Sequence, residues 1–451
     1  AAWFDYGAET PGRLLLVIHH LVVDGVSWRI IIEDLMAGYD QLERGETITL
    51  PEKATSFGSW ARRLANHAQG VKAVGELDYW ISTCRDAPPL SIDRKMDPHH
   101  QTYGETESLT TELSADETQA LLTEVPKAYH SRINDVLLAA LGVGLADWRT
   151  ARGASETVSL VDLEGHGWDD IFESVDLSRT VGWFTTMFPV RLDAGGVDIA
   201  EVGSGGPAAG SVLRRTKDYL RDVPQGGIGW GLLRYLNEKT AGILQALPRA
   251  SVSFNYLGRF DQRNAAGWQQ ALEDSGPAIA PERERDHLLE IVSVVRGETL
   301  LIEWRWSPGA HDRASIADLA ERFMVALTGL VRHCRARQVR QFTRSDFPLV
   351  ELDESRLNML QEKYPDIDDI WPLGPMQHIM LTHARRVPDS VAYHEQLWLT
   401  LEGALDEHAL ETAWQGLIAR HGSLRVAFPH DDGGPVQIVR RTARPRWSFA
   451  D

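Results

Sequence analysis

The sequence predicts a layered α/β or α+β fold, because strand-like and helical segments alternate along most of its 451 residues. Some strand-like segments alternate apolar and polar residues, as antiparallel strands with one solvated face do. The hydrophobic content of 43% is that of a packed globular protein and excludes wholesale disorder. A chain of this length typically forms two or three domains.

The first elements are a strand and a helix joined by a short loop. Residues 13–18 form an apolar run typical of a strand buried on both faces. Apolar residues then recur at helical spacing over 28–39, and either Asp24 or Ser27 can cap this helix. A second helical stretch covers about 56–84.

The middle of the chain continues the alternation. Residues 105–113 alternate like a strand, and Ser114 with Glu117 forms a capping-box pattern that predicts a helix start. Another helix begins at Asn134, and residues 157–163 again resemble a strand. Residues 195–210 are glycine-rich, which predicts a flexible segment. Further strands are predicted at 190–192, 251–257, 288–295 and 299–306, and helices at 213–220 and 312–336.

The C-terminal part indicates a second domain. The composition of 346–363 is charged and mixed, as in a linker. Within 364–451, Pro375 begins a helix, residues 391–401 alternate as a strand, and 406–421 form a further helix.

Charge and cysteine content exclude several classes of partner. The formal net charge is −18, which disfavours nucleic acid and anionic membrane surfaces. No stretch approaches the roughly 18 apolar residues of a membrane helix, and the first residues lack the pattern of a signal peptide. Two cysteines, Cys84 and Cys334, are too few for a disulfide framework or a structural zinc site, which favours a cytoplasmic location. The chain does not begin with Met, and we expect it to be part of a longer protein.

The motif HHLVVDG follows the first predicted strand. Successive residues of a strand point to opposite faces, so one of His19 and His20 can face a cleft while the other is buried. An imidazole is suited to proton transfer near neutral pH, and Asp24 can turn back to hold the loop. The alternative interpretation is two strand-end histidines followed by an Asp helix cap.

Two further motifs lie on predicted strands. In DLEGHG, Glu164 and His166 share one face if the segment is extended, and burial would make Glu164 a second proton-transfer group. The alternative is an exposed polar turn. In SFNYLGRF, Asn255 and Tyr256 point to opposite faces, and the Asn255 amide can donate to a developing oxyanion. The alternative is a buried amide satisfied by the backbone.

Two glycine-containing motifs complete the set. SRTVGWFTTMFPV (178–190) indicates a tight loop against a cleft or, alternatively, aromatic core packing. The glycines of GIGWGLLRYL (227–236) could seat backbone near a ligand arm, but no Lys-Ser/Thr pair follows as in a phosphate loop.

In their order and spacing, these five motifs resemble the epimerization domains of non-ribosomal peptide synthetases, which are members of the condensation-domain superfamily. The resemblance covers about residues 1–345. It implies a chloramphenicol-acetyltransferase-like fold of two lobes with a tunnel between them. Residues 1–110 would be part of the N-terminal lobe and 111–345 the C-terminal lobe. The family's earliest motifs are absent, so we expect the N-terminal lobe to be incomplete.

The resemblance also assigns roles to individual residues. His20 matches the active-site histidine and Glu164 the carboxylate thought to work with it. Asp24 matches a structural aspartate and His19 a buried supporting histidine. Asn255 and Tyr256 match the strand near the thioester. One departure is that Trp168-Asp169 follows EGHG where the family usually has Arg-Glu.

The function that the resemblance implies is epimerization of an L-aminoacyl or peptidyl thioester to the D form. A base removes the Cα proton and an acid returns one to the opposite face; whether Glu164 or His20 is the base for the L form stays open. No intrinsic cofactor or metal is expected. The substrate would be carried on the phosphopantetheine of an upstream peptidyl carrier protein. The alternatives are an amide-forming condensation domain, against which EGHG and FNYLGR argue, and a catalytically silent docking relative, which should have lost His20 or Glu164.

Residues 364–451 resemble the beginning of a second, downstream condensation domain. The segment YPDIDDIWPLGPMQ carries this resemblance, which stops before that domain's own HHxxxDG motif. We therefore expect no catalysis from this truncated part alone.

Overall fold

The computed structural model describes residues 1–53, 55–95, 101–165, 167, 171–173, 175–260, 268, 271, 273, 275–276, 279–337, 340–430 and 433–448. It divides into two compact units, Ala1–Gln338 and Val339–Asp451. Each unit is described by itself.

The first unit is built on a six-stranded mixed sheet with the strand order β3-β8-β7-β6-β4-β5. The central pairs β4–β6 and β6–β7 are parallel, and the other neighbouring pairs are antiparallel. This arrangement confirms the predicted mixed α/β class. The strands are β3 (Glu107–Leu113), β4 (Val158–Gly165), β5 (Thr186–Asp193), β6 (Val252–Phe260), β7 (Leu289–Arg296) and β8 (Thr299–Trp306).

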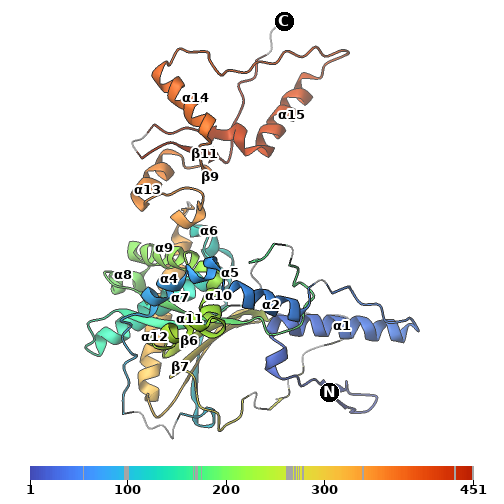
Figure 1. Ribbon diagram of the computed structural model, residues 1–451, viewed down its shortest axis with the longest axis vertical. Coiled ribbons are helices and arrows are strands. Elements are labelled where there is room, and N and C mark those ends of the chain that lie inside the picture. The colour runs from blue at the N-terminus through green and yellow to red at the C-terminus, as the bar shows by residue number, and fades with distance from the viewer. Residues whose placement is uncertain are drawn as a thin grey trace. The chain divides into compact units, whose positions relative to one another are not determined.

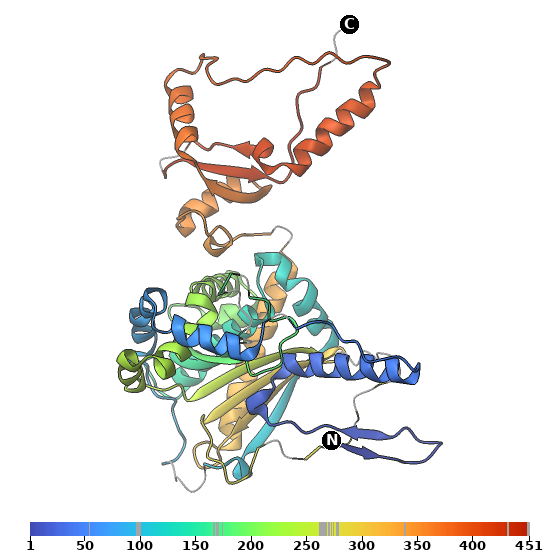
Figure 2. The ribbon, with the colours of Figure 1, turned by 45° about the vertical axis from the view of Figure 1, so that its right-hand side comes forward.

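Helices of the first unit surround this sheet (Figures 1 and 2). All but the glycine-rich region and the edges of the elements agree with the predicted pattern. The helices are α1 (Gly25–Glu43), α2 (Phe57–His67), α3 (Val71–Val74), α4 (Leu77–Cys84), α5 (Ala115–Thr123), α6 (Val125–Tyr129), α7 (Ile133–Ala151), α8 (Ile199–Ser204), α9 (Pro207–Arg221), α10 (Ile228–Gly231), α11 (Glu238–Gln245) and α12 (Arg313–Ala336).

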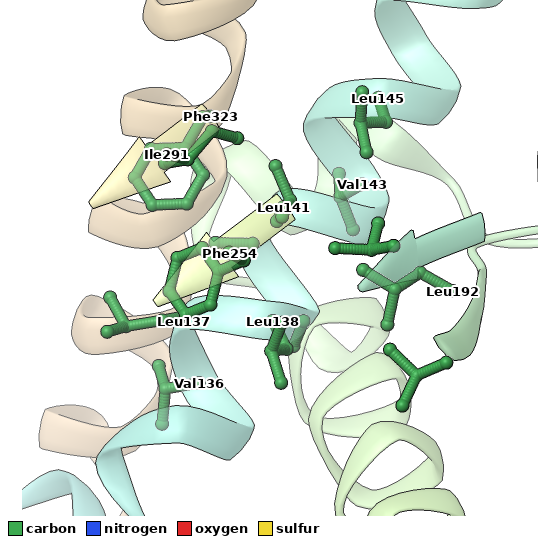
Figure 3. Close-up of a cluster of buried hydrophobic side chains, with 14 of the residues drawn as sticks. Val136, Leu137, Leu138, Leu141, Val143, Leu145, Leu192, Phe254, Ile291 and Phe323 are labelled. Carbon is green, nitrogen blue, oxygen red and sulfur yellow. The ribbon is translucent and has the colours of Figure 1, made fainter. Parts of the chain in front are cut away.

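The main hydrophobic core lies between one face of the sheet and the helices α7 and α12. Side chains from both helices meet Phe254 of β6 and Ile291 of β7 there, and Figure 3 shows part of this cluster. Gly144 permits the close approach of the two helices, since a Cβ at that position would lie 3.0 Å from the backbone of Phe323. Because strand residues alternate between faces, the residues between these apolar ones form a second, polar face of the sheet.

The N-terminal segment differs from the prediction. Residues 13–18 were expected to form a strand buried on both faces, but β2 (Arg13–Leu15) pairs only with β1 (Ala2–Phe4) in a two-stranded ribbon. Val17 is 76% exposed. A run of apolar residues is buried on both faces only where layers cover both sides of it, and none of the described residues does so here.

Two other expectations are wrong. The glycine-rich segment 195–210 contains α8 and the start of α9, because Asp198 caps α8 through the amide of Glu201 and Pro207 occupies the first turn of α9. In the second unit, residues 391–401 form no strand.

The second unit contains a three-stranded antiparallel sheet in the order β10-β11-β9. The segment 346–363, interpreted from the sequence as a linker, carries a helix whose Leu357 and Leu360 pack with Ile370 and Ile438 of the sheet. The helices at Pro375 and after residue 406 are confirmed. The elements are α13 (Glu354–Lys363), β9 (Ile367–Pro372), α14 (Pro375–Arg386), α15 (Glu407–Arg420), β10 (Val426–Ala427) and β11 (Val436–Arg440).

Both cysteines are buried and free. Burial raises the pKa of each thiol to about 12, so the reactive thiolate is scarce at neutral pH. Within the described part of the chain, no helix combines the length and apolarity that a membrane crossing requires.

A buried histidine predicts how the stability of the first unit depends on pH. His311 is 1% exposed, and burial lowers its pKa. The unfolded chain therefore binds a proton that the folded chain does not, once the pH falls below the ordinary histidine pKa of about 6.5. We expect the free energy of unfolding to decrease from there towards the lower, folded-state pKa. Urea unfolding between pH 7 and 5 should show a smaller decrease for His311→Leu than for the native chain. The exposed His408→Leu variant is the control, and equal slopes for all three proteins would contradict the prediction.

Candidate active site

Asp24 fixes the start of α1 and joins it to a distant loop. It is 3% exposed and caps the helix, accepting a hydrogen bond from the Ser27 amide at 2.8 Å. Its second carboxylate oxygen accepts from the Phe184 amide at 3.1 Å. The Ser27 hydroxyl donates to the Gly182 carbonyl at 2.8 Å. These bonds hold the HHLVVDG and SRTVGWFTTMFPV motifs together.

His20 lies in the short 3-10 turn η1 (His20–Val22), immediately before Asp24. Its Nδ1 is 2.6 Å from the Val23 carbonyl oxygen, which can only accept, so Nδ1 carries a hydrogen. The neutral ring therefore presents an unprotonated Nε2, which is the atom that a general base needs. The indole of Trp183 stacks on the imidazole, with the ring centroids 4.7 Å apart and the planes at 25°.

His19 is not buried, contrary to the role that the resemblance implies. Its side chain is exposed and caps η1, because Nδ1 accepts a hydrogen bond from the Leu21 amide at 3.1 Å. The turn at His19 and His20 replaces the strand that would have sent the two rings to opposite faces.

Glu164 lies at the C-terminal end of β4, on the polar face of the sheet. The parallel register pairs Leu163 with Phe254, so the next residues, Glu164 and Asn255, lie side by side on that face. The Asn255 amide donates a hydrogen bond to the Glu164 carboxylate. The amide is thus bonded to a side chain, and not to the backbone as one interpretation of the sequence had it.

The surroundings of Glu164 make it harder to ionise. The side chain is accessible to solvent, but the protein atoms around its carboxylate reduce its solvation and raise its pKa. Positive charge on His20 opposes this rise more than any other group, followed by His287. The structure therefore brings His20 and Glu164 within electrostatic reach of one another.

Tyr256 lies on the opposite side of β6 from Asn255. It packs against the main hydrophobic core, where burial raises its pKa. It can support the strand, but it does not share the polar face with Glu164. His166, Trp168 and Asp169 lie outside the described residues.

The polar face holds more ionisable groups than the motifs indicated. His287 Nε2 lies 2.8 Å from the Asp162 carboxylate, and the exposed fraction of the His287 side chain is 7%. Asp162 belongs to the DLEGHG motif, but nothing in the sequence marked it as the partner of His287. The signal available was parity: Asp162 is two residues before Glu164 and so shares its strand face.

Glycines in the remaining motifs permit close packing within the protein. A Cβ at Gly182 would lie 2.2 Å from the Phe57 ring, and one at Gly229 would lie 1.8 Å from the Glu76 carboxylate. Phe184 packs with Trp60 in a separate buried cluster. The core-packing interpretation therefore accounts for these positions, whereas Trp183 alone reaches His20.

The described residues contain no group of three or more His, Cys, Asp or Glu side chains arranged to hold a metal ion. A cavity of about 290 Å³ lies within the helical layer, lined by residues of α7, α8 and α12. Its Arg322 is already engaged by Asp147 and Asp318, at 2.5 and 3.1 Å. This cavity contains none of the motif residues.

Removing the Asp24 carboxylate should destabilise the first unit. Asp24→Ala leaves the Ser27 and Phe184 amides without their acceptor, and we expect a loss of about 2–4 kcal/mol in the free energy of unfolding. Asp24→Asn keeps one acceptor oxygen and should lose less. Urea unfolding measures both variants. An unchanged midpoint for Asp24→Ala would show that water replaces these bonds without cost.

The chain belongs to the condensation-domain family. It matches the family model described as Condensation domain over residues 6–348 and again over 367–451. This confirms the resemblance to the condensation superfamily of non-ribosomal peptide synthetases, which the motifs had indicated.

Particular relatives refine this assignment. The chain is 39% identical over 449 residues to one of the linear gramicidin synthases of Brevibacillus parabrevis, and 33% identical over 423 residues to bacitracin synthase 3 of Bacillus licheniformis. These alignments cover 98% and 93% of this chain but only 6% of each relative. Among solved structures, it is similar to the epimerization domain from the third module of tyrocidine synthetase B. That match has 34% identity and a TM-score of 0.63, and it covers 71% of this chain and 69% of that domain.

Proposed function

We propose that the first unit epimerizes an aminoacyl or peptidyl thioester between its L and D forms. The observation that carries this proposal is the pairing of two proton-transfer groups, since Glu164 and His20 interact electrostatically although their motifs are far apart in the sequence. The similarity to the tyrocidine synthetase epimerization domain supports it.

The reaction requires only proton transfers. A thioester carbonyl acidifies the adjacent Cα hydrogen, because the carbanion delocalises onto the carbonyl oxygen as an enolate. One of Glu164 and His20 removes the proton, and the other delivers a proton to the opposite face of Cα. No bond to another heavy atom forms or breaks, and nothing is oxidised or reduced.

The geometry suits both groups to this relay. The raised pKa of Glu164 brings its carboxyl group closer to the range in which it can both accept and donate a proton near neutral pH. The bond between His20 Nδ1 and the Val23 carbonyl leaves Nε2 available for the second transfer. Asn255 orients Glu164 through one amide hydrogen, and its other amide hydrogen is a candidate donor to the enolate oxygen.

The substrate would be tethered and not free. In the proposed function, an upstream peptidyl carrier protein presents the thioester on its phosphopantetheine arm. A downstream condensation domain, of which residues 364–451 would be the beginning, then uses the D-configured product. No cofactor of the chain's own takes part in the proposed reaction.

The proposal is tested with a polypeptide that contains the whole chain and a carrier domain. The carrier is loaded with an L-aminoacyl group in heavy water, and the released amino acid is analysed for configuration and for deuterium at Cα. Epimerization predicts D product with deuterium incorporated. Amide formation with a second loaded carrier, without inversion, would instead support the condensation alternative. Neither product would support a silent docking relative.

A further inference from the structure

The polar face of the sheet carries a second ionisable pair beside Glu164. His287 precedes β7, and its Nε2 lies 2.8 Å from a carboxylate oxygen of Asp162 on β4. The pair is largely withdrawn from solvent, with exposed side-chain fractions of 7% for His287 and 20% for Asp162. A charge in such a place keeps more of its influence on its neighbours than a surface charge does.

The pair is close to the reacting carboxylate. Asp162 and Glu164 are two residues apart on one strand and project from the same face, at a spacing of roughly 7 Å. The charge of His287 acts on Glu164 directly. Other acids on this face have cations of their own: Arg285 faces Glu290 at 3.4 Å, while Glu303 has a similar neighbour on β8.

We propose that His287, held by Asp162, is a positioning residue that controls the charge on Glu164 and so the protonation state in which the site starts its reaction. This inference rests on the proposed function. His287 itself is placed beneath the site and need not touch the substrate. Among the ion pairs of the described residues, Glu164 has no cation of its own within bonding distance, so the second row of charges decides its ionisation.

Every ionisable group facing Glu164 enters this balance. Positive charge comes from His20 at the turn before α1 and from His287 before β7. Negative charge comes from Glu290 on β7, which opposes ionisation, and from Asp162 on β4 itself. Asn255 contributes a hydrogen bond that favours the carboxylate. Replacing His287 by glutamine leaves the Asp162 charge uncompensated next to Glu164, whereas replacing both members of the pair removes the two charges together.

The first test reads Glu164 without requiring catalysis. The whole chain is labelled with ¹³C at its glutamate carboxyl groups, and the Glu164→Gln variant identifies the Glu164 signal. We expect the titration midpoint of Glu164 to move to higher pH in His287→Gln. It should return towards the native value in the Asp162→Asn/His287→Gln double variant. His67→Gln, a change at a partly buried histidine of α2, is the matched control and should leave the midpoint in place.

The second test uses the pH dependence of epimerization in the carrier-loaded polypeptide. In His287→Gln, the rate at pH 6 should fall relative to the rate at pH 8, and the double variant should restore part of this ratio. A merely structural role would lower the rate by the same factor at every pH. An unmoved Glu164 midpoint together with an unchanged pH profile in a folded His287→Gln protein would overturn the inference. Absence of epimerization in the native polypeptide would instead refute the proposed function, and the carboxyl titration would still report on the pair.

Discussion

Glu164→Gln should lower the epimerization rate by about 10²–10⁴-fold, the contribution typical of a positioned acid–base group. Glutamine has nearly the same shape and keeps a carbonyl oxygen that can accept the bond from Asn255. It cannot take up or release a proton at neutral pH, so the variant isolates the proton transfer from the packing. The measurement is the appearance of the D-aminoacyl product on the loaded carrier.

A matched control lies on the same face of the sheet. Glu303→Gln on β8 makes the same chemical change three strands away, where the carboxylate pairs with Arg305 at 2.6 Å. The strand spacing places it roughly 14 Å from Glu164. We expect the control to retain most of the native rate. Equal losses in the two variants would mean that any disturbance of the polar face stops the reaction, and the role of Glu164 would have to be abandoned.

The raised pKa of Glu164 fixes the direction of the pH dependence. Where Glu164 acts as the base it must be ionised, and its ionised fraction falls as the pH decreases through its pKa. Because loss of solvation raises that pKa, this fall should begin at a higher pH than for an ordinary glutamate, whose pKa is about 4.3.

The sequence was sufficient to predict the local elements that have strong patterns. The strand over 157–163, the capping box at Ser114 and the Asp24 cap are all confirmed, because each depends on residues close together in the chain. The mixed α/β class follows from their alternation. The run at 13–18 was misjudged because burial depends on what covers a strand, which its own residues do not record.

The site could be predicted only in part. Glu164 and Asn255 were both singled out, but their hydrogen bond depends on β4 and β6 being neighbours, although β5 and six helical segments separate them in the sequence. His287 and Trp183 were missed as members of the site. A single histidine before an apolar strand and a tryptophan in an aromatic segment are common in ordinary packing. Only the tertiary contacts distinguish them.

His20→Ala is the other substitution with a large expected effect, again about 10²–10⁴-fold in the epimerization rate. It removes the imidazole that stacks on Trp183 and leaves a space in which added imidazole can restore part of the rate. His19→Ala is the matched control, since the neighbouring ring is exposed and only caps a short turn.

Isotope exchange then separates the roles of the two groups. If Glu164 and His20 stand on opposite faces of Cα, each variant keeps the group that faces one enantiomer. That group can still remove a hydrogen and return deuterium to the same face, so exchange continues without inversion. Glu164→Gln and His20→Ala should therefore retain exchange from opposite enantiomers when the carrier is loaded separately with L and D substrates in heavy water. The enantiomer that still exchanges in each variant identifies the base for that form. Retention of the same enantiomer in both variants would place the two groups on one face, where no relay between them could invert the carbon.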